Sequence, residues 1–145
     1  MSTYMTRAQR EEFLAGVHVG VISVSIEATK SLPLPIWYSY EPGGDVAIFT
    51  GPDSVKGRAI EATGWFSLCA QQEEPPYKYV VVEGPVTGSE ECDEEGVRAM
   101  ACRYLGEEAG DDYAETMAAD GFASKLYKMT PQRWYTADYS DDIGA

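Results

Sequence analysis

The sequence predicts a mainly β protein with short helices (an α+β chain) whose antiparallel hairpins close into a small barrel. Three observations favour this class. Several short runs alternate apolar and polar residues, as half-buried strands do. Turns rich in Gly and Pro separate these runs. Three or four other stretches have apolar residues at helical spacing, and a length of 145 residues suits a single domain, 1–145.

The first part of the chain is expected to form one helix and then strands. Thr6 and Gln9 have the spacing of a capping box, and Gly16 follows as a helix stop. The run 27–34 is polar and contains proline, so a connector is expected there. The turn residues 41–45 then predict a hairpin between the strands on either side. The expected elements are a helix over 6–15 and strands over 17–26 (with a possible bulge near Gly20), 35–40 and 46–50.

The second part continues this alternation. Asp53 or Ser54 can cap a short helix that reaches residue 62. A later helix carries an apolar stripe and ends at Gly106. The stripe consists of Val97, Met100, Ala101, Tyr104 and Leu105. The remaining expected elements are strands over 65–70 and 77–87 facing each other, helices over 90–105 and 111–119, and strands over 122–129 and 133–139.

The charge balance restricts the partners. The net charge is −13, with 24 acidic and 11 basic residues. This argues against nucleic acid and against an anionic membrane surface, because both attract clusters of Lys and Arg. No apolar run approaches the roughly 20 residues of a membrane helix. The polar start of the chain does not resemble a secretory signal, so a cytoplasmic protein is expected.

Cysteine and histidine usage excludes several kinds of site. Cys69, Cys92 and Cys102 are widely spaced and odd in number, which fits reduced thiols better than a disulfide framework or a zinc site. His18 is the single histidine, and it precedes an apolar strand, where a structural role is expected. No nucleophile–base pair is evident, but redox chemistry carried by a bound organic cofactor needs none.

The segment 50–58, TGPDSVKGR, is a candidate anion site. A strand ends there, the chain turns at Gly51, and a helix begins near Ser54. Free amides at a helix N-terminus favour an anion, and Lys56 and Arg58 add two cations. A phosphate group is the expected guest. The alternative is a solvated helix start with two exposed bases.

Aromatic residues are a second feature. They could stack on a planar cofactor, or they could simply fill the core and satisfy strand propensity. The residues concerned are Trp37, Tyr38, Tyr40, Phe49, Tyr77, Tyr79, Trp134, Tyr135 and Tyr139.

Five stretches that together span nearly the whole chain carry a resemblance to a known family. They are REEFLAGVHVGVISVS (10–25), PLPIWYSYEPGGDVAIFTGPDSVKGRAIEATGWFSLCAQ (33–71), PPYKYVVVEGPV (75–86), RYLGEEAGDDY (103–113) and TPQRWYTADYS (130–140). In these stretches the chain resembles the pyridoxamine 5′-phosphate oxidase-like split β-barrel family, and more narrowly its flavin- and deazaflavin-dependent oxidoreductases.

The resemblance implies a six-stranded split barrel that pairs as a homodimer, with a flavin-type cofactor in grooves along the dimer interface. Lys56 and Arg58, beside Ser54, occupy the place of the phosphate-binding residues. Lys78 and Tyr79 stand where oxidase members carry an Arg-Gln pair. The candidate cofactor-binding residues are Leu34, Pro35, Ile36, Trp37, Phe49, Thr50, Gly51, Ser54, Lys56, Gly57, Arg58, Lys78 and Tyr79.

The departures from the family pattern refine the functional hypothesis. No histidine follows Arg133-Trp134, and few basic residues are present, which argues against pyridoxamine phosphate oxidation. We expect an oxidoreductase that uses the deazaflavin coenzyme F-420, or FMN, for hydride transfer to a small unsaturated or quinone-like molecule. A non-catalytic protein that stores or carries the cofactor is the alternative, and an empty structural barrel is a third possibility. Candidate proton donors are Tyr38, Tyr77 and Tyr79.

Overall fold

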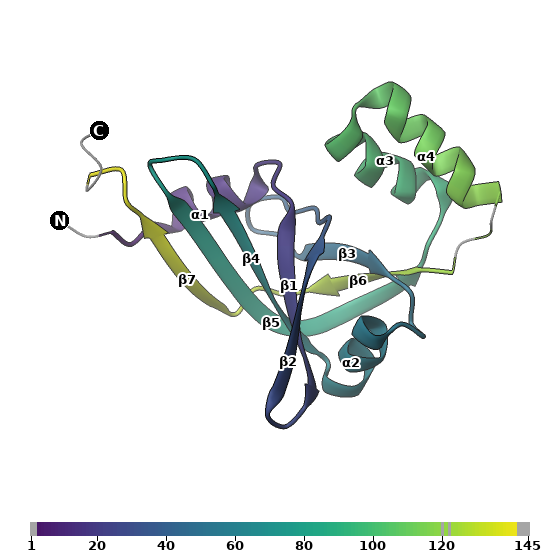
Figure 1. The fold of residues 1–145 in the computed structure, drawn as a ribbon, viewed down its shortest axis with the longest axis horizontal. Helices are drawn as coiled ribbons and strands as arrows, with labels where there is room; N and C mark the ends of the chain where they lie inside the picture. The colour runs from purple at the N-terminus through teal and green to yellow at the C-terminus, as the bar shows by residue number, and fades with distance from the viewer. Residues whose placement is uncertain (1–2, 120, 122, 142–145) are drawn as a thin grey trace.

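A computed structural model of the chain describes residues 3–119, 121 and 123–141. In this part of the chain, seven antiparallel strands form one curled sheet, with four helices around it (Figure 1). The elements are α1 (Arg7–Ala15), β1 (Gly20–Glu27), β2 (Lys30–Ile36), β3 (Val46–Thr50), α2 (Val55–Thr63), β4 (Trp65–Gln72), β5 (Lys78–Glu91), α3 (Glu94–Leu105), α4 (Glu107–Ala119), β6 (Lys125–Met129) and β7 (Arg133–Asp138).

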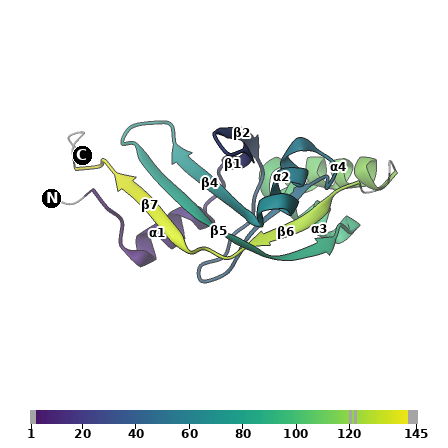
Figure 2. The ribbon, with the colours of Figure 1, turned by 90° about the horizontal axis from the view of Figure 1, so that it is seen from below.

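The sheet is organised around the long strand β5. The strand order is β2-β1-β4-β5-β6-β3, and β7 also pairs with β5. Residues 78–83 of β5 pair with β7, and residues 86–91 pair with β6. A Cβ on Gly84, between these two parts, would overlap the carbonyl of Thr130, so the chain can cross there only at a residue without a side chain. The curl and the two ends of β5 are visible in the turned view (Figure 2).

One face of the curled sheet carries the hydrophobic core. Successive strand residues point to opposite faces, so β1 buries Ile22 and Val24 while Val21 stays exposed. The helix α1 contributes Leu14 to this core, and α2 contributes Ile60. The other large, fully buried side chains are Tyr38, Val46, Ile48, Phe66, Leu68, Val80, Tyr127 and Met129.

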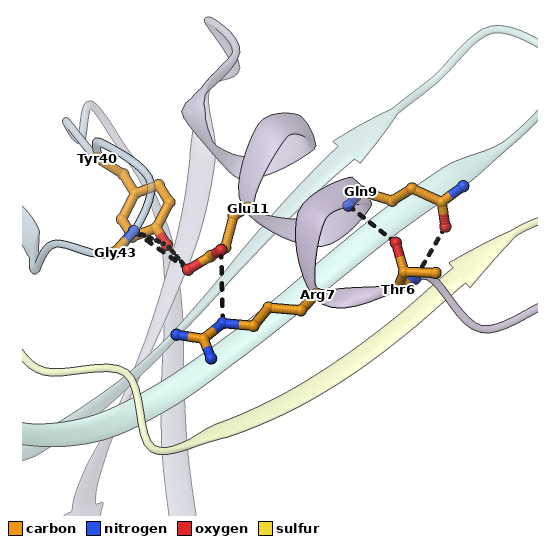
Figure 3. Close-up of polar contacts among 6 residues, drawn as sticks. All are labelled: Thr6, Arg7, Gln9, Glu11, Tyr40 and Gly43. Atoms are coloured by element: carbon orange, nitrogen blue, oxygen red, sulfur yellow. Dashed lines mark hydrogen bonds and ion pairs between the residues drawn. The ribbon is translucent and has the colours of Figure 1, made fainter.

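The predicted capping box at the start of α1 is confirmed (Figure 3). The backbone N–H of Gln9 donates to the Thr6 hydroxyl at 3.2 Å, and the Thr6 N–H donates to the Gln9 side chain at 2.8 Å. Further along the helix, Glu11 accepts from the Tyr40 hydroxyl at 3.3 Å and from the Gly43 N–H at 3.1 Å. Glu11 thereby ties α1 to the turn before β3.

The expected connector over 27–34 and the hairpin between 35–40 and 46–50 are wrong. Residues 30–36 form β2, which makes a hairpin with β1, while β3 pairs with β6. Residues 35–40 and 46–50 meet only through one isolated bridge. The prolines at 33 and 35 suggested a break, but β2 lies at the sheet edge, where a missing N–H removes no interstrand bond. The bulge lies between Ser25 and Glu27, not at Gly20.

The other differences concern boundaries. The strand β5 extends to Glu91, so α3 begins later than predicted, at Glu94 with Asp93 as its cap. The helix α4 begins earlier, at Glu107. The predicted strand over 122–129 begins outside the described residues, and β6 starts at Lys125. The Ser54 cap of α2, the pairing of β4 with β5 and the end of α3 at Gly106 are confirmed.

Candidate functional site

A cavity of about 410 Å³ lies between the sheet and the α3–α4 hairpin. The sheet side supplies Val19, just before β1, the end of β2 and Phe49 of β3, and the hairpin supplies residues of both helices. The lining residues are Val19, Pro35, Ile36, Trp37, Phe49, Cys92, Val97, Met100, Tyr113, Met117 and Ser124. None of these carries a charged side chain, so the cavity suits an uncharged, flat or apolar group.

Trp37 is the largest side chain in this wall. Its ring stacks on Tyr104 of α3, with a centroid distance of 5.2 Å and an interplanar angle of 6°. Tyr113 of α4 meets the same indole at 5.4 Å and 54°. Trp37 and Tyr113 line the cavity, whereas Tyr104 does not. The indole is therefore held from the hairpin side and offers an aromatic wall to the cavity.

The predicted anion corner begins where β3 ends. Ser54 caps α2 by accepting from the Gly57 N–H at 3.0 Å, and its hydroxyl donates to the Gly51 carbonyl at 2.7 Å. The buried Thr50 hydroxyl lies 3.3 Å from the Ser54 hydroxyl. Within the described residues, the N–H groups of Val55 and Lys56 have no acceptor. These two donors and the helix dipole make the corner suitable for an anion.

The two cations of this segment lie on different sides of α2. Residues two positions apart on a helix do not face each other, which separates Lys56 from Arg58. Lys56 is half-buried and makes no ion pair with any described residue, and burial lowers its pKa. Arg58 is exposed beside a separate surface hollow, between α2 and the turn of the β1–β2 hairpin.

The corner and the cavity are adjacent through β3 and β6. Phe49 lines the cavity, and the next residue, Thr50, touches the Ser54 cap. Ser124 also lines the cavity, and the next residue, Lys125, pairs with Thr50 across the β3–β6 ladder. The apolar cavity therefore meets the donor-rich corner along one short edge.

The remaining predicted residues are more dispersed. Leu34 packs against the core beside Ile22. Lys78 and Tyr79 lie at the start of β5, paired with β7, whereas Cys92 of the cavity follows the other end of this strand. Tyr38, a candidate proton donor, is buried, and its hydroxyl donates to the Leu14 carbonyl at 2.6 Å. The single chain thus gathers Pro35, Ile36, Trp37 and Phe49 around the cavity and leaves the others outside it.

The hairpin wall of the cavity was not predicted from the sequence. Val97 and Met100 belong to the predicted apolar stripe of a helix, but the stripe was not assigned to a ligand site. Tyr113 and Met117 are four residues apart on α4, a spacing that places two large side chains on one helix face. The spacing of that pair is the signal in the sequence that could have indicated a second wall of the cavity, opposite the sheet.

The thiols and the histidine offer no nucleophile to this site. Burial raises the pKa of the Cys92 thiol, which favours its protonated form. The His18 ring stacks on Phe13, and its Nε2 lies 3.0 Å from the Phe13 carbonyl oxygen, so its role is structural. Among the residues that the structure describes, no group of His, Cys, Asp or Glu could hold a metal ion. No helix among them is long and apolar enough to span a membrane.

Comparison with known proteins establishes the fold. No protein-family model matches the chain, and no curated protein does. A solved structure of a conserved hypothetical protein from Mycobacterium tuberculosis matches with a TM-score of 0.75 and 15% identity, over 99% of this chain and 90% of that one. An F-420 reductase matches with a TM-score of 0.67 and 17% identity, over 86% and 94% of the two chains. An FAD-binding protein from Mesorhizobium loti matches with a TM-score of 0.60 and 14% identity, over 91% and 92%.

The chain has the split β-barrel fold. The predicted mainly β split-barrel fold is therefore confirmed, with seven strands in the described residues where the resemblance implied six. Proteins of this split barrel include flavin-related ones, as the two named relatives show. At these identities the likeness extends to the fold, and activity must be argued from the site itself.

Proposed function

We propose that this split barrel is an oxidoreductase that binds the deazaflavin coenzyme F-420, or FMN, and transfers a hydride to a small unsaturated or quinone-like molecule. The observation that carries the proposal is the adjacency of an uncharged, aromatic-walled cavity to a helix N-terminus with a half-buried lysine that makes no ion pair with any described residue. Such a pair of environments matches a ligand with a flat ring and an anionic tail.

The residues present fit such a cofactor. Trp37, Pro35 and Phe49 would lie against the ring, and the free amides of Val55 and Lys56 would bind the phosphate. The bound cofactor supplies the hydride chemistry, and the chain supplies binding and orientation. Because burial without a partner disfavours the Lys56 ammonium, an anion at the corner would stabilise its charged form.

A second copy of the chain would complete this site. On the sheet face opposite the core, cross-strand partners form a transverse row through β2, β1, β4, β5 and β7. Val21 and Tyr135 of this row are 36% and 50% exposed, and Val19 beside it is 56% exposed. The row consists of Pro35, Val21, Cys69, Val81 and Tyr135. We propose that this apolar row is the homodimer interface, since Pro35 and Val19 also line the cavity.

The polar row next to it limits the interface. Ser67 donates to Glu83 at 2.9 Å, and Arg133 lies 3.7 Å from the same carboxylate. The hydrogen bond and the ion pair of these groups form within one chain, so they need no partner from a second chain. Burial of the apolar row beside them is therefore the contribution that would favour association. This arrangement supports the inference that each cavity lies beside the seam between two protomers.

A non-catalytic cofactor carrier remains the second candidate function. The absence of charged side chains among the lining residues favours it, because no strong acid or base faces the cavity. Turnover separates the two candidates. Oxidation of reduced F-420 by a panel of enones and quinones supports the enzyme, and tight binding without oxidation supports the carrier.

The binding experiment is a titration of the purified protein with F-420 and with FMN, each followed by ligand fluorescence. Lys56→Ala should weaken binding by roughly tenfold or more, because a charge-assisted contact contributes about 1.5–3 kcal/mol. Lys30→Ala is the matched control, since Lys30 is exposed at the β1–β2 turn and pairs with Glu27. Arg58→Ala tests the second predicted cation. Absence of binding by the wild type, or unchanged affinity in Lys56→Ala, would contradict the phosphate assignment.

A further inference from the structure

Among the described residues, two neighbouring side chains of α3, Arg103 and Tyr104, make the side-chain hydrogen bonds between the α3–α4 hairpin and the barrel, and we call them the hairpin anchor. The two helices contact each other far more than they contact any strand, and they stand apart from the sheet in the ribbon view (Figure 1). The hairpin nevertheless supplies Val97, Met100 and Tyr113 to the cavity. Its placement on the barrel therefore determines the shape of the cavity.

Arg103 joins α3 to two other segments through backbone carbonyls. Its Nε donates to the Tyr38 carbonyl at 3.2 Å. Its Nη2 donates to the Ala15 carbonyl at 3.1 Å and to the Gly16 carbonyl at 2.9 Å. The latter two carbonyls lie at the C-terminal end of α1, where the helix dipole favours a cation. The planar guanidinium spans all three acceptors, a geometry that lysine cannot reproduce.

Tyr104 joins the same segments with its hydroxyl. The hydroxyl lies 2.6 Å from the His18 carbonyl oxygen and 3.0 Å from that of Tyr38, and it accepts from the Tyr38 N–H at 3.1 Å. Tyr38 follows Trp37, beyond the end of β2, so its backbone groups have no partner in that strand. The Tyr104 hydroxyl therefore supplies a partner to the Tyr38 N–H and to the His18 carbonyl, while the Tyr38 carbonyl also accepts from Arg103.

The ring of Tyr104 acts directly on Trp37. It stacks on the indole at 5.2 Å and 6°, and Trp37 lines the cavity whereas Tyr104 does not. We propose that Arg103 and Tyr104 are positioning residues, which hold Trp37 and the hairpin in the arrangement that binds a flat ring. This inference rests on the proposed function. It adds that the anchor acts on the ring and not on the anionic tail of the ligand.

The test compares ligands with and without a phosphate. Riboflavin and the phosphate-free deazaflavin chromophore report on the ring, while FMN and F-420 report on ring and tail together. Tyr104→Phe keeps the stacked ring and removes the hydroxyl, and Arg103→Lys keeps the charge and removes the planar fork. Each variant should weaken the binding of riboflavin and the binding of FMN by the same factor, roughly three- to tenfold, as expected for one or two lost hydrogen bonds. Lys56→Ala should weaken the binding of FMN and leave the affinity for riboflavin unchanged.

Two matched variants serve as controls. Arg98→Lys alters a guanidinium on the same helix that pairs with Glu94 and Asp111 and not with the barrel. Tyr139→Phe removes an exposed hydroxyl beyond β7. Both should bind all four ligands like the wild type. Tyr104→Leu, which also removes the stacked ring, should weaken the binding of riboflavin further than Tyr104→Phe does. If this variant does not fold, Tyr104→Phe still decides the question.

Tryptophan fluorescence of the ligand-free protein provides a second readout. Acrylamide quenching of Trp37, identified by subtraction of the Trp37→Phe signal, should increase in Tyr104→Phe and in Arg103→Lys and stay constant in the controls. The proposal is wrong if the folded Tyr104→Phe variant retains wild-type riboflavin affinity or wild-type quenching. If the wild type binds none of the four ligands, the proposed function fails, and quenching alone then decides whether the anchor holds the indole.

Discussion

Gly57 of α2 lies directly against the carbonyl of Gly51, so closely that a Cβ at position 57 would overlap this oxygen. The first turn of α2 therefore packs on the turn after β3 without an intervening side chain. This close approach brings the Ser54 cap within reach of Gly57 N–H and Gly51 carbonyl together. Gly57 thus shapes the proposed anion corner, although it offers no side chain to a ligand.

Gly57→Ala should destabilise the protein, because the new methyl group must displace backbone atoms of Gly51. We expect a loss of roughly 1–3 kcal/mol in the free energy of unfolding. Urea denaturation followed by circular dichroism measures it. Gly88→Ala is the control, since a Cβ there would meet only the Lys128 side chain at 3.8 Å. Equal stability of the two variants would show that the corner can rearrange freely.

Thr6→Ala should weaken the start of α1. It removes the hydroxyl that accepts from the Gln9 N–H in the capping box, and loss of such a cap costs about 1 kcal/mol. Thermal unfolding should show a lower melting temperature. Thr116→Ala, within α4, removes a hydroxyl that donates to the Asp112 carbonyl of its own helix, and it should have a smaller effect. The capping argument fails if Thr116→Ala costs as much.

His18 should make the stability depend on pH below neutrality. Burial, with a smaller contribution from the nearby Arg103, lowers its pKa below 6.5, against the opposing hydrogen bond to Phe13. The unfolded chain then binds the proton more readily than the folded one. The stability contributed by neutral His18 is therefore present above pH 6.5 and is lost as the pH falls from 6.5 through the lower folded pKa.

The measurement compares the wild type with His18→Gln in urea at pH 7.5 and pH 5.5. The stability difference in favour of the wild type should shrink at the lower pH. His18 is the single histidine, so no other imidazole contributes in this range. A difference that stays constant with pH would contradict a lowered pKa.

Val21→Glu should dissociate the proposed homodimer. A carboxylate in the middle of the apolar row would lose its hydration in the interface, at a cost that only a charged partner could offset. Sedimentation velocity should then show monomers. Affinity for FMN should also fall, since Pro35 and Val19 connect the row to the cavity. Ile26→Glu is the control, because Ile26 is 42% exposed on the same strand and lies at the bulge, away from the row of cross-strand partners. A monomeric wild type would contradict the interface at once.

Most elements were predictable from the sequence because their signals are local. The Thr6–Gln9 box, the Ser54 cap and Gly106 each determine a helix end through atoms within a few residues. The strand β2 was missed because prolines at 33 and 35 forbid a central strand, and local sequence does not say whether a strand lies at an edge. The pairing of β3 with β6 joins residues far apart in the chain, which no local pattern reports.

The candidate site was predictable only in part, for the same reason. Trp37 and Phe49 were expected to contact a ring, and both line the cavity. Tyr104 was predicted only as part of an apolar stripe. Its role was not predictable, because it depends on carbonyls of His18 and Tyr38 that only the folded chain brings near. Lys56 and Arg58 are close in sequence, but the helical period separates them in space.

The prolines of β2 have a consequence for the behaviour of the protein in solution. The strand β2 pairs with β1 on one side, and it ends the sheet on the other. Pro33 and Pro35 have no N–H, so the free side of this strand lacks the regular series of donors that a foreign strand would need. We therefore expect concentrated samples to resist growth of the sheet by strand addition at this end, whichever ligand the barrel binds.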